Sequence, residues 1–328
     1  MRVRYALLAL LTVFVASGCT GGDDEPAADR PTDLPTVAAG AWRTLAAAPS
    51  QRTEVAAAAM GGRIVVTGGY RADGATVSTV EILDTATGRW EAGPSLPLPV
   101  NHAMSVAIDN RVYVFGGYLP ENRPTDTTFV LDGAEWRRLA PMPRPRAAAT
   151  AVAAGGTVYV AGGIGPSGLA AEMLVYDTAT DRWTTAPGPP TRREHLGGAG
   201  FGGLVYTVGG RTGGLDTNLA AFEAYDPRSG AWTRLPDLPT PRGGLAATAT
   251  CAGQIVAVGG EARATFGEAE VFDIGTATWK ALPPLPTPRH GLGIVAIRNT
   301  IYALAGGPEP GLHVADTTEA IETGGVCQ

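Results

Sequence analysis

A double glycine recurs at a nearly constant interval along this chain of 328 residues, with successive pairs 48, 46, 47, 50 and 47 residues apart. The six tryptophans keep the same period, at intervals of 48, 46, 47, 49 and 47 residues. Two independent markers with one period indicate an internal repeat, which restricts the chain to a solenoid, a propeller or a similar array. The glycine pairs are Gly68-Gly69, Gly116-Gly117, Gly162-Gly163, Gly209-Gly210, Gly259-Gly260 and Gly306-Gly307. The tryptophans are Trp42, Trp90, Trp136, Trp183, Trp232 and Trp279.

Every unit of the repeat has its parts in the same order. An alanine-rich stretch and a short turn lead into a β-branched and aromatic run, such as residues 112–115, which ends at the glycine pair. A polar loop, an apolar run ending in aspartate such as 175–177, the tryptophan and a proline-rich segment follow. These short runs between turns predict four strands per unit and no helix. Six such units predict an all-β fold, a six-bladed β-propeller.

Four features of the unit resemble kelch repeats: the double glycine, the tyrosine before it in several units, an aspartate six residues before the tryptophan, and a closing Pro-Arg. The aspartate spacing holds in four units and shortens to four residues at Asp132 and Trp136. The resemblance covers residues 41–323. It implies a six-bladed kelch propeller, similar in architecture to the propeller domain of galactose oxidase and to kelch sialic-acid epimerases.

The order of the markers predicts how the ring closes. Trp42 precedes every glycine pair, whereas the last pair is followed by the run 313–323 and by no tryptophan. We therefore expect the N-terminal strand around Trp42 to be the outer strand of the last blade. Such closure removes an open sheet edge, which would otherwise template aggregation.

The first residues predict export. Two arginines precede a short apolar run at 6–15, and small residues then lead to Cys19. This pattern is typical of a signal peptide, and its ending resembles a bacterial lipobox. We expect a signal peptide at 1–18, an acylated Cys19, a disordered acidic tether over 19–40, the propeller at 41–323 and a tail at 324–328. The expected location is the outer face of the bacterial cell membrane; an ordinary signal peptide with an incidental cysteine is the alternative.

The charge of the chain restricts its partners. The formal net charge is −6, and removal of 1–18 would take away two arginines and no acid. A negative chain is not suited to nucleic acid or to electrostatic binding of anionic lipid. We expect a monomer that binds a protein or a carbohydrate, touches the membrane only through its lipid anchor and has no cofactor.

Two further cysteines, Cys251 and Cys327, are candidates for a disulfide, which export permits. Cys251 is expected at the turn before the fifth glycine-pair strand, and Cys327 just after the last strand, at the same end of the propeller. The alternative is a buried thiol at 251 and a loose cysteine in the tail.

Arginines recur before the glycine pairs, 16 residues ahead in three units and 17 residues ahead in two, with Val100 in the remaining unit. A ring of arginines at an axial mouth would suit a carboxylate or a phosphate. The alternative is a structural role, in which they pair with acids or carbonyls between blades. These candidates are Arg52, Arg146, Arg193, Arg242 and Arg289. The repeated strand glutamates are interpreted as structural: Glu81, Glu223, Glu270 and Glu319.

The loops after the glycine pairs carry a second set of candidates that would suit a sugar. They are Tyr70, Arg71, Tyr118, Glu121, Arg123, Arg211, Glu261, Arg263 and Glu309. The alternative is that these loops are polar only because loops usually are.

Histidines His102, His195 and His290 fall on alternate blades. A three-histidine metal site is not expected, because the first two lie 14 residues before their pairs and His290 lies 16 before, or about 15 after correction for an insertion. An odd offset turns a strand side chain to the other face. Alternate inner strands are also expected to lie far apart. His195 is kept as a ligand candidate, and no metal is predicted.

These patterns favour a binding or protein-interaction module over an enzyme. The alternative is an epimerase or mutarotase for an anionic sugar at the axial mouth, as the resemblance implies. There the arginines would hold the carboxylate, and Glu261 or His195 would move the proton. The fold cannot decide between these functions, because one scaffold hosts many activities.

Overall fold

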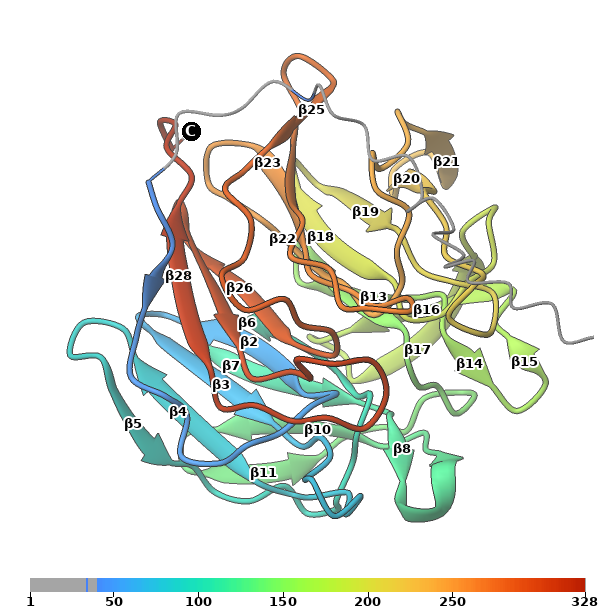
Figure 1. Ribbon diagram of the computed structural model, residues 1–328. Helices are drawn as coiled ribbons and strands as arrows, with labels where there is room; N and C mark the ends of the chain where they lie inside the picture. Colours follow the sequence, from blue (N-terminus) through green and yellow to red (C-terminus); the bar gives the residue numbers. More distant parts are fainter. Residues whose placement is uncertain (1–33, 35–39, 328) are drawn as a thin grey trace, which may run out of the picture. The chain divides into compact units, whose positions relative to one another are not determined.

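The computed structural model describes residue 34 and residues 40–327. The predicted signal peptide, Cys19 and nearly all of the predicted tether lie outside these residues. Within the described part of the chain, the strands form six antiparallel sheets of four strands each, and two small hairpins lie in loops. The all-β six-bladed propeller expected from the repeat is confirmed (Figure 1).

Blades 1 to 3 follow the chain from the inner to the outer strand. Blade 1 contains β2 (Ala56–Met60), β3 (Arg63–Thr67), β4 (Val80–Asp84) and β5 (Arg89–Ala92). Blade 2 contains β6 (Met104–Ile108), β7 (Arg111–Phe115), β10 (Thr128–Asp132) and β11 (Glu135–Arg138). Blade 3 contains β12 (Thr150–Ala154), β13 (Thr157–Ala161), β16 (Glu172–Asp177) and β17 (Arg182–Pro187).

Blades 4 to 6 complete the ring. Blade 4 contains β18 (Gly197–Phe201), β19 (Leu204–Val208), β20 (Phe222–Asp226) and β21 (Ala231–Arg234). Blade 5 contains β22 (Ala246–Ala249), β23 (Gln254–Val258), β24 (Ala269–Asp273) and β25 (Thr278–Ala281). Blade 6 contains β26 (Gly293–Ile297), β27 (Thr300–Leu304), β28 (Thr318–Glu322) and the N-terminal strand β1 (Arg43–Thr44).

The last blade is closed by the first strand, as the order of the markers predicts. Arg43 lies opposite Ala320, and Thr44 lies opposite Glu319. Figure 1 shows the blue N-terminal strand beside the red β28. The innermost strands β2, β6, β12, β18, β22 and β26 contact one another in sequence and return to β2. The ring is therefore continuous across the seam.

The loops contain little regular structure. The hairpins are β8 (Tyr118–Leu119) with β9 (Arg123–Pro124), and β14 (Ile164–Gly165) with β15 (Gly168–Leu169). A 3₁₀ turn, η1 (Pro120–Asn122), joins the strands of the first hairpin, so the expectation of no helix fails only at this one short turn of the described chain. Over the described residues, no helix is both long enough and apolar enough to span a membrane.

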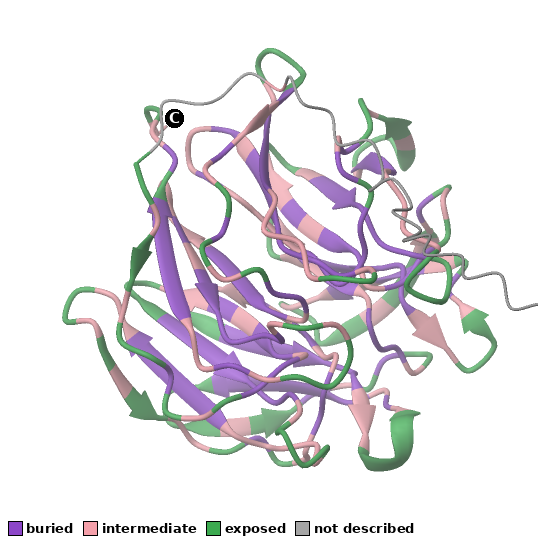
Figure 2. Ribbon diagram, in the orientation of Figure 1, coloured by how far each residue is buried: buried purple, intermediate pink, exposed green. Residues whose placement is uncertain are grey.

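Burial follows strand position within each blade. The second and third strands are almost wholly buried, whereas β5, β11 and β21 are largely exposed (Figure 2). Apolar side chains from neighbouring sheets pack face to face: Phe115 of blade 2 lies 6.0 Å from Tyr176 of blade 3, measured between ring centroids. Fully burying a large apolar side chain contributes roughly 1.5–3 kcal/mol. The core is thus divided into layers between blades.

The six tryptophans link each blade to the one before it. Every indole N–H donates a hydrogen bond of 2.7–2.9 Å to the backbone carbonyl four residues after the preceding tryptophan of the ring. The donor and acceptor pairs are Trp90 with Ala46, Trp136 with Pro94, Trp183 with Ala140, Trp232 with Pro187, Trp279 with Pro236, and Trp42 with Pro283. The bond from Trp42 crosses the seam and completes the set.

The glycine pairs end the second strands where neighbouring blades crowd the axis. Gly116 has a φ of 54°, and a Cβ there would lie 2.1 Å from the carbonyl oxygen of Arg146 in the next blade. Gly117 donates its N–H to that same carbonyl at 2.8 Å. The pair therefore allows a left-handed turn and a close backbone approach that a side chain would prevent.

The sixth pair is displaced by one residue from the position expected. Ala305 and Gly306 have φ values of 54° and 99°, close to those of Gly68 and Gly69. Gly306 also donates to Arg52 O, as Gly69 does to Val100 O. Ala305-Gly306 is thus the true equivalent, and Arg289 lies 16 residues before it, as in most blades. Only blade 5 has a longer inner hairpin, because its turn at 250–253 is extended.

Gly116→Ala is expected to lower the free energy of unfolding by more than about 2 kcal/mol, because left-handed strain adds to a clash with backbone. Gly133→Ala is the matched control: Gly133 has a φ of 67°, but a Cβ placed on it would have nothing within 4 Å. Gly133→Ala should lower the free energy of unfolding by about 1 kcal/mol, which is the cost of the left-handed strain alone. Urea denaturation measures both. Equal losses would contradict the packing argument.

Candidate functional site

The antiparallel topology defines two ends of the propeller. In blade 1, the start of β2 at residue 56 and the loop after Gly69 lie at one end of the sheet. The turns at 61–62 and 85–88 lie together at the opposite end, where the N–H of Thr85 donates a hydrogen bond to Gly62 O. We call the first the mouth end and the second the far end. Loops after the glycine pairs therefore lie at the mouth end of every blade.

A left-handed residue precedes every innermost strand. In each blade it stands two positions after the recurrent arginine or Val100, and its φ lies between 49° and 69°. The six residues are Glu54, His102, Ala148, His195, Gly244 and Gly291. Because the chain turns sharply here, the side chain at this position is directed toward the axis, before the alternation of the strand begins.

These turns are joined to one another by backbone hydrogen bonds. The N–H of His102 donates to Glu54 O, and equivalent bonds of 2.8–3.1 Å run from each blade to the preceding one as far as Gly291. Val55 N–H closes the circuit by donating to Gly291 O at 3.3 Å. The ring holds six side-chain positions around the axis: three carry Glu or His, and three carry Ala or Gly.

Seven charged or titratable side chains meet at this ring, and we call them the axial cluster. They are Glu54, His102, Glu194, His195, Arg211, Glu261 and His290. Glu54 is central: its Oε2 lies 3.2 Å from His102 Nε2, and its Oε1 lies 3.2 Å from His290 Nδ1. The rings of His102 and His195 are 4.9 Å apart between centroids. The cluster thus draws residues from blades 1, 2, 4, 5 and 6.

The remaining members form a chain of contacts on one side. His195 Nδ1 bonds to Glu194 Oε2, and Arg211 connects Glu194 Oε1 at 3.0 Å with Glu261 Oε1 at 2.8 Å. Glu261 Oε2 lies 3.6 Å from His290 Nδ1 and accepts the N–H of Gly311. Every carboxylate of the cluster is therefore held by at least two groups.

Small residues make room for these side chains. A Cβ on Gly291 would lie 2.5 Å from Glu54 Oε1, and one on Gly307 would lie 2.5 Å from His290 Nε2. Gly307 follows the displaced Ala305-Gly306 pair, in the position where other blades have Tyr70, Tyr118 or Arg211. A side chain at either glycine would displace part of the cluster.

The environment shifts the pKa values in the cluster in different directions. Burial raises the pKa of Glu54, but the adjacent His102, His290 and His195 outweigh it and hold the pKa well below its usual range. Burial lowers the pKa of His102 to about 4 despite the nearby Glu54. For His290, burial is outweighed by Glu54 and Glu261, so its pKa is raised. Glu54 is therefore ionised at neutral pH, and His102 is neutral.

A cavity of about 360 Å³ runs along the axis beneath the cluster. Its walls are the innermost strands, with small residues such as Ala57, Ala151, Gly198 and Ala247 facing it. The side chains of Glu54, His102 and His195 are 12%, 13% and 11% exposed, so water reaches them. The cluster lies at the mouth end of this channel.

The comparison with known proteins agrees with the repeat. Residues 55–236 match the family described as the KLHDC2/KLHL20/DRC7 Kelch-repeats domain, and residues 242–286 match the Kelch motif. The chain belongs to the kelch-repeat family.

Curated kelch proteins match it over part of their length. It is 34% identical over 122 residues to the Kelch-like protein terF of Aspergillus terreus, covering 33% of this chain and 26% of that protein. It is 33% identical over 120 residues to human Kelch repeat and BTB domain-containing protein 13, covering 35% and 26%. It is 31% identical over 121 residues to Alpha-scruin of Limulus polyphemus, covering 35% and 13%. The matched region spans about a quarter or less of these relatives.

The five recurrent arginines of the kelch units are placed inside the blades and not at the mouth. Each is at most 1% exposed. Each of the first four donates a hydrogen bond to the carbonyl of the first glycine of its own pair, as Arg193 does to Gly209 O at 2.6 Å. In this structure they have no exposed surface with which to meet a ligand. Their burial agrees with the structural alternative, and the axis-facing residue stands two positions later in each blade.

Four of these arginines pair with the repeated strand glutamates. The pairs are Arg52–Glu81, Arg193–Glu223, Arg242–Glu270 and Arg289–Glu319. Blade 2 has apolar residues in both places, Val100 and Phe129. Arg146 of blade 3 has Leu174 at the glutamate position and donates to the backbone carbonyl of Glu172 instead. The structural interpretation of the glutamates agrees with these contacts.

The candidates in the loops divide into two groups. Arg211 and Glu261 join the axial cluster, and Tyr118 lies beside it, with its ring 5.5 Å from that of His102. Arg71 is exposed and pairs with Asp73 at 2.6 Å. The other candidates lie on loops of the mouth end, where Tyr70 is half-buried; they are Glu121, Arg123, Arg263 and Glu309.

The histidines require a correction. Sequence spacing placed His102, His195 and His290 too far apart to meet, yet all three lie around Glu54. Strand alternation does not apply to His102 and His195, because both occupy the left-handed position ahead of the strand. Glu54 and Glu194 were missed altogether. The signal that identifies Glu54 is its register: it stands two residues after Arg52, as His195 does after Arg193.

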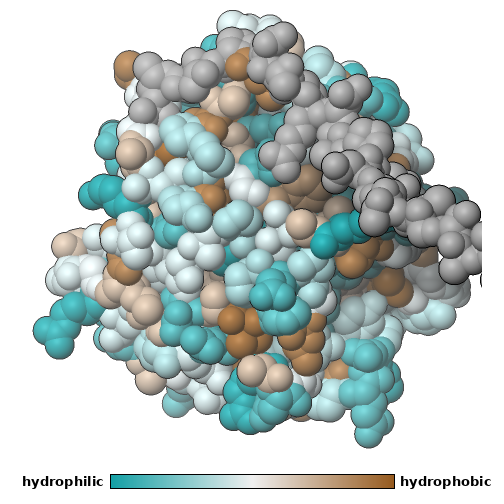
Figure 3. All heavy atoms as spheres, viewed as in Figure 1, coloured by the Kyte–Doolittle hydropathy of each residue, from teal (hydrophilic) through white to brown (hydrophobic). Residues whose placement is uncertain are grey.

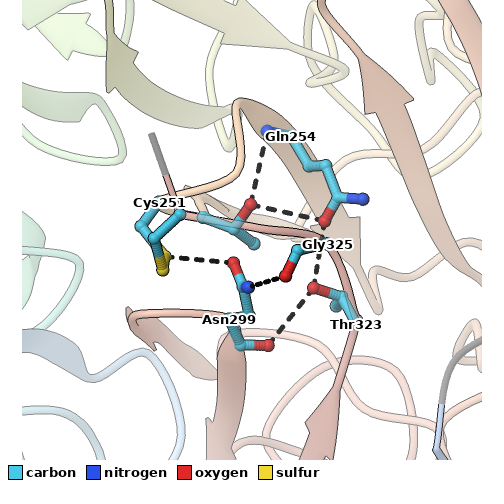
Figure 4. Close-up of a disulfide and its surroundings, with 7 residues drawn as sticks. Cys251, Gln254, Asn299, Thr323 and Gly325 are labelled. Atoms are coloured by element: carbon cyan, nitrogen blue, oxygen red, sulfur yellow. Dashed lines mark hydrogen bonds between the residues drawn. A yellow bond between two sulfur atoms is a disulfide. The ribbon is translucent and has the colours of Figure 1, made fainter.

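A disulfide joins Cys251 to Cys327, with Cα atoms 4.7 Å apart. It connects the extended turn of blade 5 with the tail that follows β28 of blade 6, at the far end. Figure 4 shows the hydrogen bonds around it: Asn299 donates to Gly325 O at 2.8 Å, and Thr323 donates to Gln254 Oε1 at 3.0 Å. The tail is thereby fixed to the neighbouring blade.

Arg193→Met should destabilise the fold by about 3–5 kcal/mol, because it leaves Glu223 buried without its partner. Arg234→Met is the matched control, since its pair with Asp237 is exposed and should contribute less than about 1 kcal/mol. The double variant Arg193→Val with Glu223→Phe copies blade 2 and should recover much of the loss. Urea unfolding checks all three; a double variant that loses the sum of the single effects would contradict this account.

The axial pKa values predict that two histidine variants change the pH dependence of stability in opposite senses and in different pH ranges. The lowered pKa of His102 gives stability that is complete above its ordinary pKa of 6.5 and is lost as pH falls toward about 4. The raised pKa of His290 gives stability that is present below 6.5 and is lost as pH rises through its folded value. His102→Gln should therefore flatten the rise in unfolding free energy between about pH 4.5 and 6.5, and His290→Gln should remove a fall in unfolding free energy that begins above about pH 6.5.

For His102 the effect is at most roughly 3 kcal/mol, at about 1.4 kcal/mol per unit of pKa difference. Urea denaturation between about pH 4.5 and 8.5, in buffer containing a chelator, measures the slopes on both sides of pH 6.5. His313→Gln, at an exposed histidine, is the control and should leave the slope unchanged. The same slope in all four proteins would contradict the assigned pKa directions.

Proposed function

We propose that this chain is an extracytoplasmic, lipid-anchored kelch propeller that acts as a protein-binding module through its mouth end. The observation that carries the proposal is the position of the chain's entry into the propeller. Gly40 N–H bonds to Glu322 O, at the end of β28, and thus lies at the far end beside the disulfide-linked tail. A tether that precedes Gly40 would therefore join the propeller at its far end, opposite the mouth loops.

The mouth loops differ from one another in length and in the side chains they carry, as is expected of a recognition surface. They range from the short segment around Ala262 to the hairpin β8–β9, and they carry exposed residues of both charges together with Leu215 and Leu312. On the face drawn in Figure 3, hydrophobic residues appear in small groups among hydrophilic ones. A mixed surface of this kind suits a non-obligate protein partner.

The burial of the arginines also supports a binding module over an enzyme for anionic sugars. Such an enzyme needs cations at the mouth to hold the sugar carboxylate. Here the guanidinium groups of the recurrent arginines are used within the blades, and Arg211 is paired with Glu194 and Glu261. Loops on a rigid scaffold remain the parts that are available for recognition.

Two measurements on the full chain expressed in a bacterium test the proposal. Cys19→Ser should move the protein from the membrane fraction to the soluble fraction and abolish labelling with palmitate, whereas Thr20→Ser, its neighbour, should change neither. A photo-crosslinking residue in place of Arg123, at the mouth, should give adducts with other proteins, whereas the same residue in place of Ala86, in a far-end turn, should not.

Membrane retention and labelling of the Cys19→Ser variant would refute the anchor. Equal adduct yields from the two positions would refute recognition by the mouth.

A further inference from the structure

Each histidine of the axial cluster is held by one ring nitrogen. His102 Nδ1 lies 2.6 Å from Asn101 Oδ1, His195 Nδ1 contacts Glu194 Oε2, and His290 Nε2 lies 3.1 Å from Glu309 O. An oxygen acceptor requires the N–H at that nitrogen. In the neutral ring, the other nitrogen therefore has a free lone pair.

The second ring nitrogens of two of these histidines face one carboxylate. His102 Nε2 and His290 Nδ1 lie 3.2 Å from opposite oxygens of Glu54. His290 is 2% exposed, and its Nδ1 also lies 3.6 Å from Glu261 Oε2.

The charge of the cluster favours a cation. Within the cluster, the three carboxylates of Glu54, Glu194 and Glu261 face the single guanidinium of Arg211, so acidic groups outnumber permanently positive ones. Burial of uncompensated charge is costly unless it is paired or coordinates a metal. A divalent ion would neutralise it.

We propose that Glu54, His102 and His195 bind a divalent transition-metal ion at the mouth end of the axial channel. Their ligand atoms lie within 4.8 Å of one another. Two imidazole nitrogens and a carboxylate oxygen suit Zn²⁺ and its first-row neighbours, whereas Ca²⁺ and Mg²⁺ prefer oxygen alone. Three protein ligands also leave a coordination position open, as in catalytic and exchangeable sites.

The surrounding residues have the roles of an outer shell. Metal-binding histidines usually donate their second N–H to a carboxylate or a carbonyl, which fixes the ring and the tautomer. Glu194 does this for His195, and Asn101, itself oriented by a bond to Thr76 Oγ1 at 2.7 Å, does it for His102. His290 contacts the second oxygen of Glu54 and is a positioning residue. The partial exposure of the three ligands provides access from the channel.

The test uses the chelator-treated full chain and Zn²⁺ as the probe, in calorimetric titrations with a competing chelator. The wild type should bind one equivalent. Glu54→Gln, His102→Asn and His195→Asn should each weaken binding at least about 100-fold, and Glu194→Gln by roughly 10–100-fold, the effect of removing an outer-shell partner. His313→Asn, at an exposed histidine of the same end, should bind as the wild type does.

Absence of stoichiometric binding by the wild type, or wild-type affinity in Glu54→Gln and His195→Asn, would overturn the proposal. Loss of binding in His313→Asn would overturn it as well. A measurement on the wild type covers the case in which a ligand variant fails to fold. Nitrogen-detected NMR should show Zn²⁺ shifting the ring signals of His102 and His195 and leaving His313 unchanged; unshifted ligand signals would also refute the site. The outcome does not depend on the lipid anchor or on a protein partner.

Discussion

The left-handed turn that begins each innermost strand determines most of what this propeller presents at its axis. Six such turns are linked by backbone bonds from one blade to the next, so the backbone there is fixed by its neighbours on both sides. A residue in this turn adopts a strained conformation, and the surrounding ring compensates for it. In return, its side chain is directed at the axis whatever its chemistry. Substitution at these positions changes the site without changing the scaffold.

Three consecutive residues in each blade serve different parts of the molecule. In blade 4, Arg193 points into the sheet and joins Gly209 O to Glu223, Glu194 supports its neighbour, and His195 faces the axis. The buried arginine is a construction element, because it ties the strand entry to the glycine pair. The same three positions in blade 2 hold Val100, Asn101 and His102. The scaffold role and the axial role can therefore vary independently.

The sequence predicts the scaffold well because its signals are local and repeated six times. Glycine pairs and tryptophans mark the strand ends, and their order reveals the seam at β1. The site is harder to predict, because one residue of register decides whether a side chain enters a blade or faces the axis. Strand alternation begins only after His102 and His195, and Ala305 in place of glycine hides the true register of blade 6. Contacts such as that between Glu54 and His290 depend on closure of the ring, which joins residues 236 positions apart (290 minus 54).

The tryptophan hydrogen bonds do not depend on which blade contains the two ends of the chain. All six run in one direction, from each blade to the equivalent carbonyl segment of its predecessor, and the bond from Trp42 to Pro283 is no different from the other five. The hydrogen bonds of the ring therefore do not distinguish a first blade. Blade 6 differs only because the two ends of the chain meet in it, where the pairing of β1 with β28 and the disulfide hold them. A circular permutation, with the ends joined and a new opening made in another linker, would preserve the complete set of bonds. In such a molecule the axial cluster would stay the same while the two chain ends moved to another blade.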